Sequence, residues 1–299
     1  MEQSTKLPTF LIIGVQKAGT TSIYNYLKQH PQVYMSPVKE TNFLERDWET
    51  IAPEVVNKNG IDTFEKYSQL FTGVKEELAI GEASPNYLFH YESASERILR
   101  YLPNAQLIAV LRNPVERAYS DCLMHVRDAI GAGKSRTLSE QIKSKSNSSF
   151  TLRKGLYSQQ LKYFFDAFGK DKIKVYLYDD FSKKPVDTIQ DMYRFIGIDD
   201  HFCPDMSKKS QVAQVPKVQF LNTLLRKQNP LREFAASVLK NFLPLPLRQN
   251  LRSSLINMNS TGKTSLSLEE RQELVEFYRE DILKLQDLIQ RDLSSWLSI

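Results

Sequence analysis

The chain has 299 residues, of which 41% are hydrophobic and 25% are charged, so intrinsic disorder and fibrous repeats are excluded. This length allows one large domain with a buried core, and we expect a single domain over residues 1–299. The net charge of +5 is too small and too dispersed to suggest a dedicated nucleic-acid binder.

No apolar run approaches the roughly 18 residues that a transmembrane helix needs. The first such run, residues 10–15, is too short for a signal-peptide core, so we expect neither a signal sequence nor a transmembrane segment. Only Cys122 and Cys203 are present, which implies no disulfide framework. We therefore expect a reduced, cytoplasmic setting.

Predicted strands and helices alternate along the chain. Continuous apolar runs predict strands at residues 10–14, 79–81, 106–111 and 173–178. Helical spacing, caps and prolines predict helices at 20–30, 114 to about 127, 157–168, 185–196 and from about 268, with Asn113 and Ser267 as caps. This alternation indicates an α/β fold with a central parallel sheet and helices on both faces. The segment at about 129–150, rich in Ser, Lys and Gly, is predicted to be a mobile surface loop.

The segment GVQKAGTTS, residues 14–22, lies between a predicted buried strand and a helix start. Gly14 and Gly19 permit a tight turn, Lys17 adds a charge, and the hydroxyls at 20–22 add donors. The helix N-terminus adds unpaired N–H groups and the positive end of a dipole. Glycine spacing matches the triphosphate-binding loop, but Thr20 occupies its lysine position. The segment therefore predicts an anion site of phosphate type.

A second segment, LRNPVERAYS, covers residues 111–120. Arg112 leaves the end of a predicted strand, where ligands of α/β folds bind, and Ser120 lies two turns into the next helix. An arginine fork and a hydroxyl can hold one phosphate together. Considered alone, this segment is better explained as a solvated turn than as a phosphate site. Considered together with the glycine-containing segment at 14–22, it indicates a second phosphate contact.

Taken together, these segments resemble the sulfotransferases that use 3′-phosphoadenosine 5′-phosphosulfate (PAPS), with the first as the 5′-phosphosulfate loop and the second as the 3′-phosphate motif. The likeness is greatest to heparan-sulfate-type N- and O-sulfotransferases and their bacterial relatives. It implies a P-loop-NTPase-like sulfotransferase fold. Further matching segments are KETNFL (39–44), GEASPNYL (81–88), KGLYSQQL (154–161) and TGKTSLSLEERQELVEFY (261–278).

The resemblance implies roles for individual residues. The 5′-phosphosulfate contacts would come from Lys17, Ala18, Gly19, Thr20, Thr21 and Ser22. Arg112, Ser120, Tyr157, Gly262 and Lys263 would lie on the 3′-phosphate side. Glu40 occupies the position of the catalytic glutamate of heparan-type members. We therefore expect Glu40 as general base and Lys17 as the group that stabilises the leaving nucleotide.

Two positions depart from the heparan type: Ala83 replaces a lysine near the transferred sulfonate, and Asn42 replaces a histidine of some members. The reaction class is retained, but a heparan-like acceptor is less well supported.

The triplet Arg153–Gly155 is similar to a cofactor-binding triplet of cytosolic members. It stands before the strand predicted at 173–178, which is the wrong place for that role.

The predicted reaction is the in-line transfer of a sulfonyl group from PAPS, as co-substrate, to a hydroxyl or amine. No metal is expected, because the four histidines are scattered and no C-x-x-C occurs. The acceptor stays open among a polysaccharide, a glycolipid, a carrier-bound acyl hydroxyl and a small metabolite. Two alternatives remain: a nucleotide-dependent kinase with a variant loop, and a non-catalytic module that binds 3′-phosphoadenosine 5′-phosphate (PAP).

A helical insertion at about 217–256 contains a basic stretch, with six basic residues against one acidic residue over 226–252. Three interpretations are open: a peripheral helix with a solvated basic face, a wall of the acceptor site, or a peripheral membrane contact.

Overall fold

The computed structural model describes residues 6–48, 50, 57–129, 138–143, 149–207, 215–216, 260–261 and 266–299. The predicted insertion at about 217–256 lies outside these residues, as do Gly262 and Lys263. The single domain over residues 1–299 stays a prediction.

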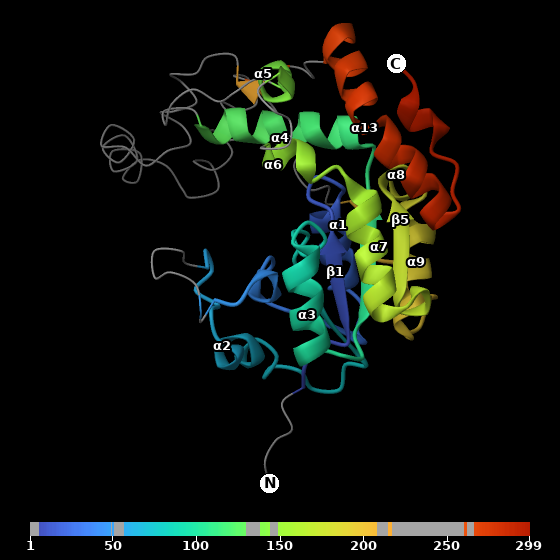
Figure 1. The fold of residues 1–299 in the computed structure, drawn as a ribbon. Coiled ribbons are helices and arrows are strands. Elements are labelled where there is room, and N and C mark those ends of the chain that lie inside the picture. The colour runs from blue at the N-terminus through green and yellow to red at the C-terminus, as the bar shows by residue number, and fades with distance from the viewer. Residues whose placement is uncertain are drawn as a thin grey trace, which may run out of the picture.

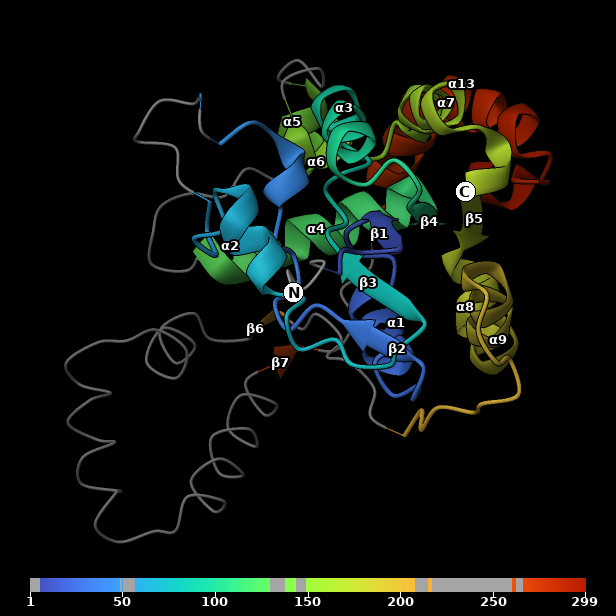
Figure 2. The ribbon, with the colours of Figure 1, turned by 90° about the horizontal axis from the view of Figure 1, so that it is seen from below.

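Five parallel strands form the central sheet in the order β2-β3-β1-β4-β5 (Figure 2). The strands are β1 (Phe10–Gly14), β2 (Val33–Met35), β3 (Ala79–Ala83), β4 (Gln106–Leu111) and β5 (Ile173–Leu177). Every residue of β1 and β3 is buried, because helices cover both faces of a parallel sheet. The predicted fold class is confirmed. The strand order reverses at β1, and this is where α/β folds open a ligand crevice.

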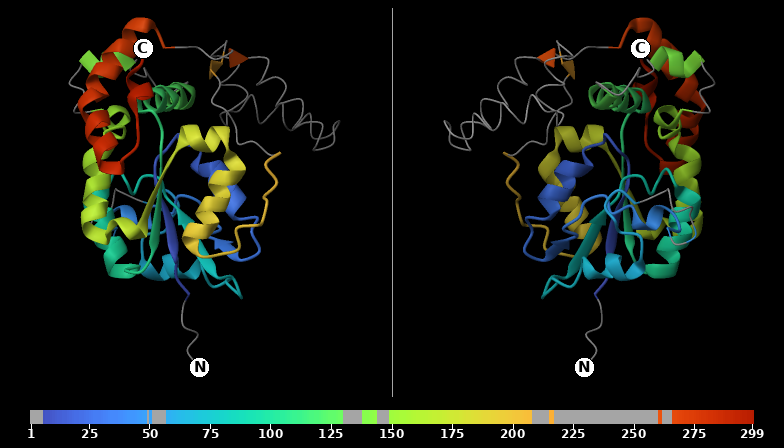
Figure 3. Two further views of the ribbon diagram at one scale, coloured as in Figure 1. Left: turned by 90° about the vertical axis from the view of Figure 1, so that its right-hand side faces the viewer. Right: turned by 90° about the vertical axis from the view of Figure 1, so that its left-hand side faces the viewer.

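Helices form a layer on each face of the sheet (Figure 3). One layer contains α1 (Thr20–Leu27), α8 (Tyr178–Lys183) and α9 (Pro185–Ile196). The other contains α3 (Tyr91–Tyr101), α7 (Tyr157–Phe168) and α13 (Leu268–Ile289), and α7 packs against both of its neighbours. The helix α4 (Pro114–Ala129) lies across the end of the sheet at which the strands finish (Figure 1). Shorter elements are the 3₁₀ turns η1 (Phe43–Glu45), η3 (Lys170–Lys172) and η4 (Ser294–Leu297), the helices α2 (Phe64–Gln69), α5 (Leu138–Lys143) and α6 (Phe150–Arg153), and the pair β6 (Val215–Pro216) and β7 (Ser260–Thr261).

Two predicted helix caps are confirmed. Asn113 accepts a 2.9 Å hydrogen bond at Oδ1 from the backbone N–H of Val115, at the start of α4. Ser267 and Glu270 form a reciprocal capping box, in which each side chain accepts a hydrogen bond from the backbone N–H of the other residue. Both helices therefore begin where their local sequence predicts.

Several predicted bounds were wrong. The first helix ends at Leu27 rather than His30, because a tighter turn follows in which His30 N–H donates to the Leu27 carbonyl. Tyr178 begins α8 instead of ending β5, because Leu177 is the last residue of β5 paired with β4. The third misplaced bound is that of β3, which extends to Ala83.

The segment predicted as a loop at about 129–150 contains the helix α5. Leu138 and Ile142 lie four residues apart, on one helical face, and Leu138 is buried. The prediction of a continuous loop was therefore wrong for residues 138–143. Residues 130–137 and 144–148 lie outside the described part of the chain.

Candidate active site

Glycines stand at both ends of the turn after β1: Gly14 is the last residue of β1, and Gly19 precedes α1. A Cβ atom on Gly14 would lie 2.9 Å from Leu88, within the packed sheet layer. Gly19 has a φ of 80°, in the left-handed region, and a Cβ there would lie 3.0 Å from the Phe181 ring. A side chain at either position would therefore displace the loop. The two glycines permit the chain to turn from β1 into α1 within five residues.

Lys17 occupies the middle of this loop with a φ of 73°. Such a conformation is unfavourable for a residue with a Cβ atom, and it concentrates at functional sites because the surrounding fold must hold it. The half-buried side chain places Nζ 3.3 Å from the Met124 sulfur of α4. The N-terminus of α1 follows directly and contributes the positive end of its dipole. A lysine charge and a helix N-terminus thus meet in one short turn.

Arg112 connects the two predicted phosphate segments. Its Nη1 atom donates a 2.8 Å hydrogen bond to the Lys17 carbonyl, and its guanidinium lies 4.9 Å from the centre of the Tyr178 ring. Tyr157 is fully buried, and its hydroxyl donates a 2.8 Å hydrogen bond to the Arg112 carbonyl. The end of β4 is therefore fixed against the loop after β1. Two cationic side chains that are far apart in sequence lie at the same edge of the sheet.

For the other residues predicted to contact the nucleotide, the structure shows their position and their exposure. Thr20 and Ala18 are buried in the loop and the start of α1, whereas Thr21 is exposed and Ser22 is half-buried. Ser120 is half-buried on α4. Contacts of these residues with a nucleotide stay predictions, as does the contact of Tyr157.

Glu40 lies on the segment that follows β2. Its backbone N–H donates to the Ala83 carbonyl at 2.9 Å, which fixes Glu40 beside the carboxyl end of β3. Glu40 and Asn42 have φ values of 62° and 52°, so both ends of this short turn are in the left-handed region. The Glu40 carboxylate pairs with Lys39 at 2.5 Å and is 36% exposed. The predicted base is therefore held at the sheet edge but remains open to solvent.

Sequence reasoning missed a buried carboxyl group below this turn. Glu82 is fully buried in β3, and it accepts hydrogen bonds from the hydroxyls of Thr41, Tyr67, Ser84 and Tyr87. Burial raises the pKa of Glu82, although the hydroxyl groups oppose this shift. Thr41 lies between Glu40 and Asn42, so Glu82 holds the turn that carries the predicted base. The predicted strand ended at Gly81, so no signal in the sequence indicated that the next residue, Glu82, is buried in β3.

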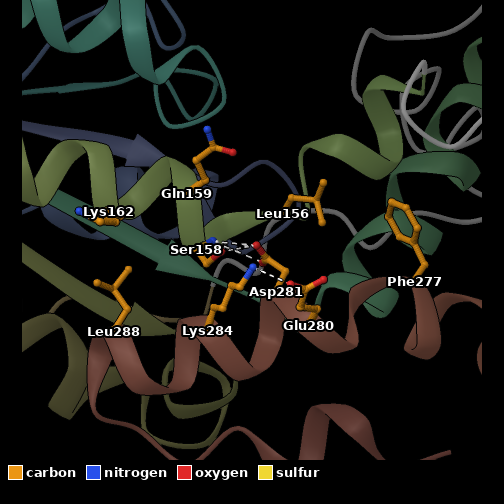
Figure 4. Close-up of a pocket in the computed structure, with 9 residues that line it drawn as sticks. All are labelled: Leu156, Ser158, Gln159, Lys162, Phe277, Glu280, Asp281, Lys284 and Leu288. Atoms are coloured by element: carbon orange, nitrogen blue, oxygen red, sulfur yellow. Dashed lines mark hydrogen bonds and ion pairs between the residues drawn. The ribbon is translucent and has the colours of Figure 1, made fainter.

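A pocket of about 540 Å³ lies between α7 and α13, apart from this edge (Figure 4). None of the residues that line it is a predicted site residue. Asp281 of α13 accepts hydrogen bonds there from the backbone N–H of Tyr157 and from the N–H and hydroxyl of Ser158. Burial raises the pKa of Asp281. Asp281 thus caps α7 and supports Tyr157, and the pocket is not the candidate active site.

Among the described residues, one group has the spacing of metal ligands: Asp199, Asp200 and His201. His201 is 92% exposed, and Asp200 pairs with Arg194 at 2.6 Å. The arginine and the histidine satisfy both carboxylates, so this surface cluster supports no metal centre.

Comparison with known proteins places the chain in a family. The sequence profile of the sulfotransferase family matches residues 8–202. A sulfotransferase from Alicyclobacillus acidocaldarius is 28% identical, with a TM-score of 0.72 over 98% of this chain and 100% of that one. The chain therefore belongs to the sulfotransferase family.

Two similar curated proteins are the membrane-associated sulfotransferase kil1 of Dictyostelium discoideum and the human bifunctional heparan sulfate N-deacetylase/N-sulfotransferase 3. They are 36% and 34% identical to the chain, each over 38% of its length. The matched regions cover only 22% and 13% of these relatives. The predicted resemblance to sulfotransferases, including the heparan-sulfate type, is confirmed.

Proposed function

We propose that the protein transfers the sulfonyl group of PAPS to a hydroxyl or an amine of an acceptor. The observation that carries this proposal is the hydrogen bond from Arg112 to the Lys17 carbonyl, which unites two cationic segments at the end of β1 and β4. PAPS carries one anionic group at each end of its ribose, and these segments offer one site for each. The family of the chain supports the same chemistry.

The loop residues suit the leaving side of the reaction. As the bond from sulfur to the nucleotide breaks, negative charge grows on the bridging oxygen. Lys17 and the N–H groups at the start of α1 can stabilise that charge without rearranging, because the glycines and the surrounding contacts already fix the loop. Arg112 would hold the 3′-phosphate, which both the substrate PAPS and the product PAP carry.

The acceptor must lose a proton while its oxygen or nitrogen attacks sulfur, and we assign this proton to Glu40. The backbone contact with Ala83 holds Glu40 at the carboxyl edge of the sheet. Its partial exposure leaves the carboxylate within reach of an acceptor that arrives from solvent. Lys39, which pairs with Glu40, would orient the carboxylate until the acceptor binds.

For the acceptor we propose a carbohydrate. One similar protein is named for heparan sulfate and another, 34% identical over 39% of the chain, is carbohydrate sulfotransferase 15 of Homo sapiens. Ala83 and Asn42, which depart from the heparan type, argue against a heparan-like acceptor. The cytoplasmic setting stays a prediction; none of the described helices combines the length and apolar character of a bilayer crossing.

A transfer assay with ³⁵S-labelled PAPS and a panel of carbohydrate, glycolipid and small-molecule acceptors tests the proposal. We expect acceptor-dependent transfer that survives a metal chelator. A kinase with a variant loop would instead need Mg²⁺ and bind ATP. A nucleotide-binding module would bind PAP but transfer no label. Either of these results would overturn the proposed function.

A further inference from the structure

Lys154 reaches the phosphate loop from a distant part of the chain. It follows α6 as the C-terminal cap of that short helix. Its Nζ atom donates a 2.8 Å hydrogen bond to the side-chain oxygen of Gln16, the residue before Lys17. The sequence motif that contains Lys154 suggested no role at this loop, because the triplet stands before the strand predicted at 173–178. The fold nevertheless brings a third cation to the candidate site.

Within the described part of the chain, the groups in direct contact with the Lys154 ammonium are neutral. Among the described residues, no carboxylate forms an ion pair with Lys154, and its hydrogen-bond partner, the Gln16 amide, is neutral. The Phe89 ring, with its centre 5.8 Å from Nζ, contributes a weaker attraction. Burial lowers the pKa of Lys154, and the charges of Asp121, Glu45 and Glu40 oppose this shift. An anion bound at the loop would supply the missing partner.

The contacts of Lys154 indicate which anionic group of the donor it would meet. Lys154 contacts the loop through Gln16 and lies over the ring of Phe89, on the segment that follows β3. Glu40 is fixed at the end of the same strand by its backbone contact with Ala83. In an in-line transfer, sulfur lies between the acceptor atom, near the base, and the leaving oxygen, near the loop. Arg112 lies instead at the end of β4 and contacts Lys17. The Lys154 charge therefore acts where the transferred group must pass, whereas Arg112 suits the 3′-phosphate.

We infer that Lys154 is a catalytic residue that contacts the sulfonyl group of PAPS during transfer, and this inference rests on the proposed function. The acceptor oxygen or nitrogen forms a bond to sulfur while the bond from sulfur to the 5′-phosphate oxygen breaks. The electron pair of the broken bond stays on the nucleotide, and the acceptor proton passes to Glu40. Lys154 holds the sulfonyl oxygens throughout and exchanges no proton.

The test compares the affinities for PAPS and PAP, since only PAPS carries the sulfonyl group. In Lys154→Met we expect affinity for PAPS to fall about tenfold, with affinity for PAP unchanged, and the single-turnover rate to fall about 10- to 100-fold. Lys154→Arg should recover part of both losses, because it retains the charge. Lys162→Met is the matched control, since this α7 lysine is 63% exposed and pairs with Asp166.

A second variant separates a catalytic contact from a structural one. If Lys154 only fixes the loop, Gln16→Ala removes the same hydrogen bond and should reproduce the losses of Lys154→Met; that result would overturn the inference. An equal loss of PAPS and PAP affinity in Lys154→Met would overturn it as well. Thermal unfolding shows whether each variant is folded. If Lys154→Met does not fold, Lys154→Gln is measured in its place. A wild-type protein that binds neither nucleotide contradicts the proposed function itself, whereas a result confined to the variants concerns Lys154 alone.

Discussion

Arg112 donates a 2.8 Å hydrogen bond from its guanidinium to the carbonyl oxygen of Lys17, although 95 residues separate them in sequence. The contact is possible because β4, which precedes Arg112, pairs directly with β1, which precedes the loop of Lys17. One Nη1 hydrogen of the guanidinium fixes the loop. Within the described part of the chain the guanidinium forms no ion pair, so its remaining N–H groups can hold an anion. Arg112 therefore couples the shape of the loop to the site that we propose for the 3′-phosphate.

Replacing Arg112 should weaken the binding of PAPS and PAP alike, since both carry the 3′-phosphate. We expect Arg112→Ala to cost about 2–3 kcal/mol for each nucleotide, as measured by calorimetry. Arg112→Lys should recover only part of the loss, because an ammonium lacks the planar fork. Arg100→Ala, at an exposed position on α3, is the control. Equal PAP affinity of wild type and Arg112→Ala would refute the assignment.

Removing the Lys17 charge should affect the transition state more than nucleotide binding. We expect Lys17→Ala to lower kcat by roughly 100-fold or more, because the charge is needed mainly when the leaving oxygen becomes negative. The measurement is steady-state transfer from labelled PAPS, combined with calorimetric binding of PAP. Unchanged kcat with weakened PAPS binding would show that Lys17 binds the donor without assisting its departure.

Replacing Glu40 by glutamine preserves the shape of the side chain and removes the proton acceptor. We expect Glu40→Gln to lose about 100-fold or more in transfer while the affinity for PAP stays near that of the wild type. Lys39→Met is an informative second variant, because it removes the 2.5 Å ion pair with Glu40 and retains the Glu40 carboxylate. If Glu40→Gln transfers sulfonyl groups at the wild-type rate, another residue accepts the proton.

Glu82 should make stability depend on pH in a characteristic direction. Because burial raises the pKa of Glu82, the folded protein binds this proton more tightly than the unfolded chain does. The contribution of Glu82 to stability is therefore fully present below the unfolded pKa and is lost as the pH rises through the folded pKa. Relative to Glu82→Gln, the wild type should lose up to about 1.4 kcal/mol of unfolding free energy per pH unit across that window.

Urea unfolding of both proteins from pH 4 upward measures this difference. Glu65→Gln, at an exposed position on α2, is the control for the substitution itself. Parallel pH dependences of wild type and Glu82→Gln would show that Glu82 has the same proton affinity in the folded and unfolded chain.

Local signals in the sequence were sufficient to predict the strand β1, the loop after it and the start of the helix α1. A buried apolar run, two glycines and the following hydroxyls lie within about a dozen residues, and their preferences agree with one another. The same holds for the caps Asn113 and Ser267, which act on backbone groups two or three residues away. The strand β2 was missed because three residues are too few for a periodic pattern.

Only the tertiary structure decided which of these segments meet. The hydroxyls around Glu82 come from residues 41, 67, 84 and 87, and the partner of Lys154 lies 138 residues away. Such contacts depend on strand order and on the packing of helices over the sheet, which no local pattern encodes. The sequence by itself thus determined the turn between β1 and α1 and the fold class. The fold decided that Arg112 fixes that loop and that Lys154 joins it, because both contacts require neighbouring elements that are distant along the chain.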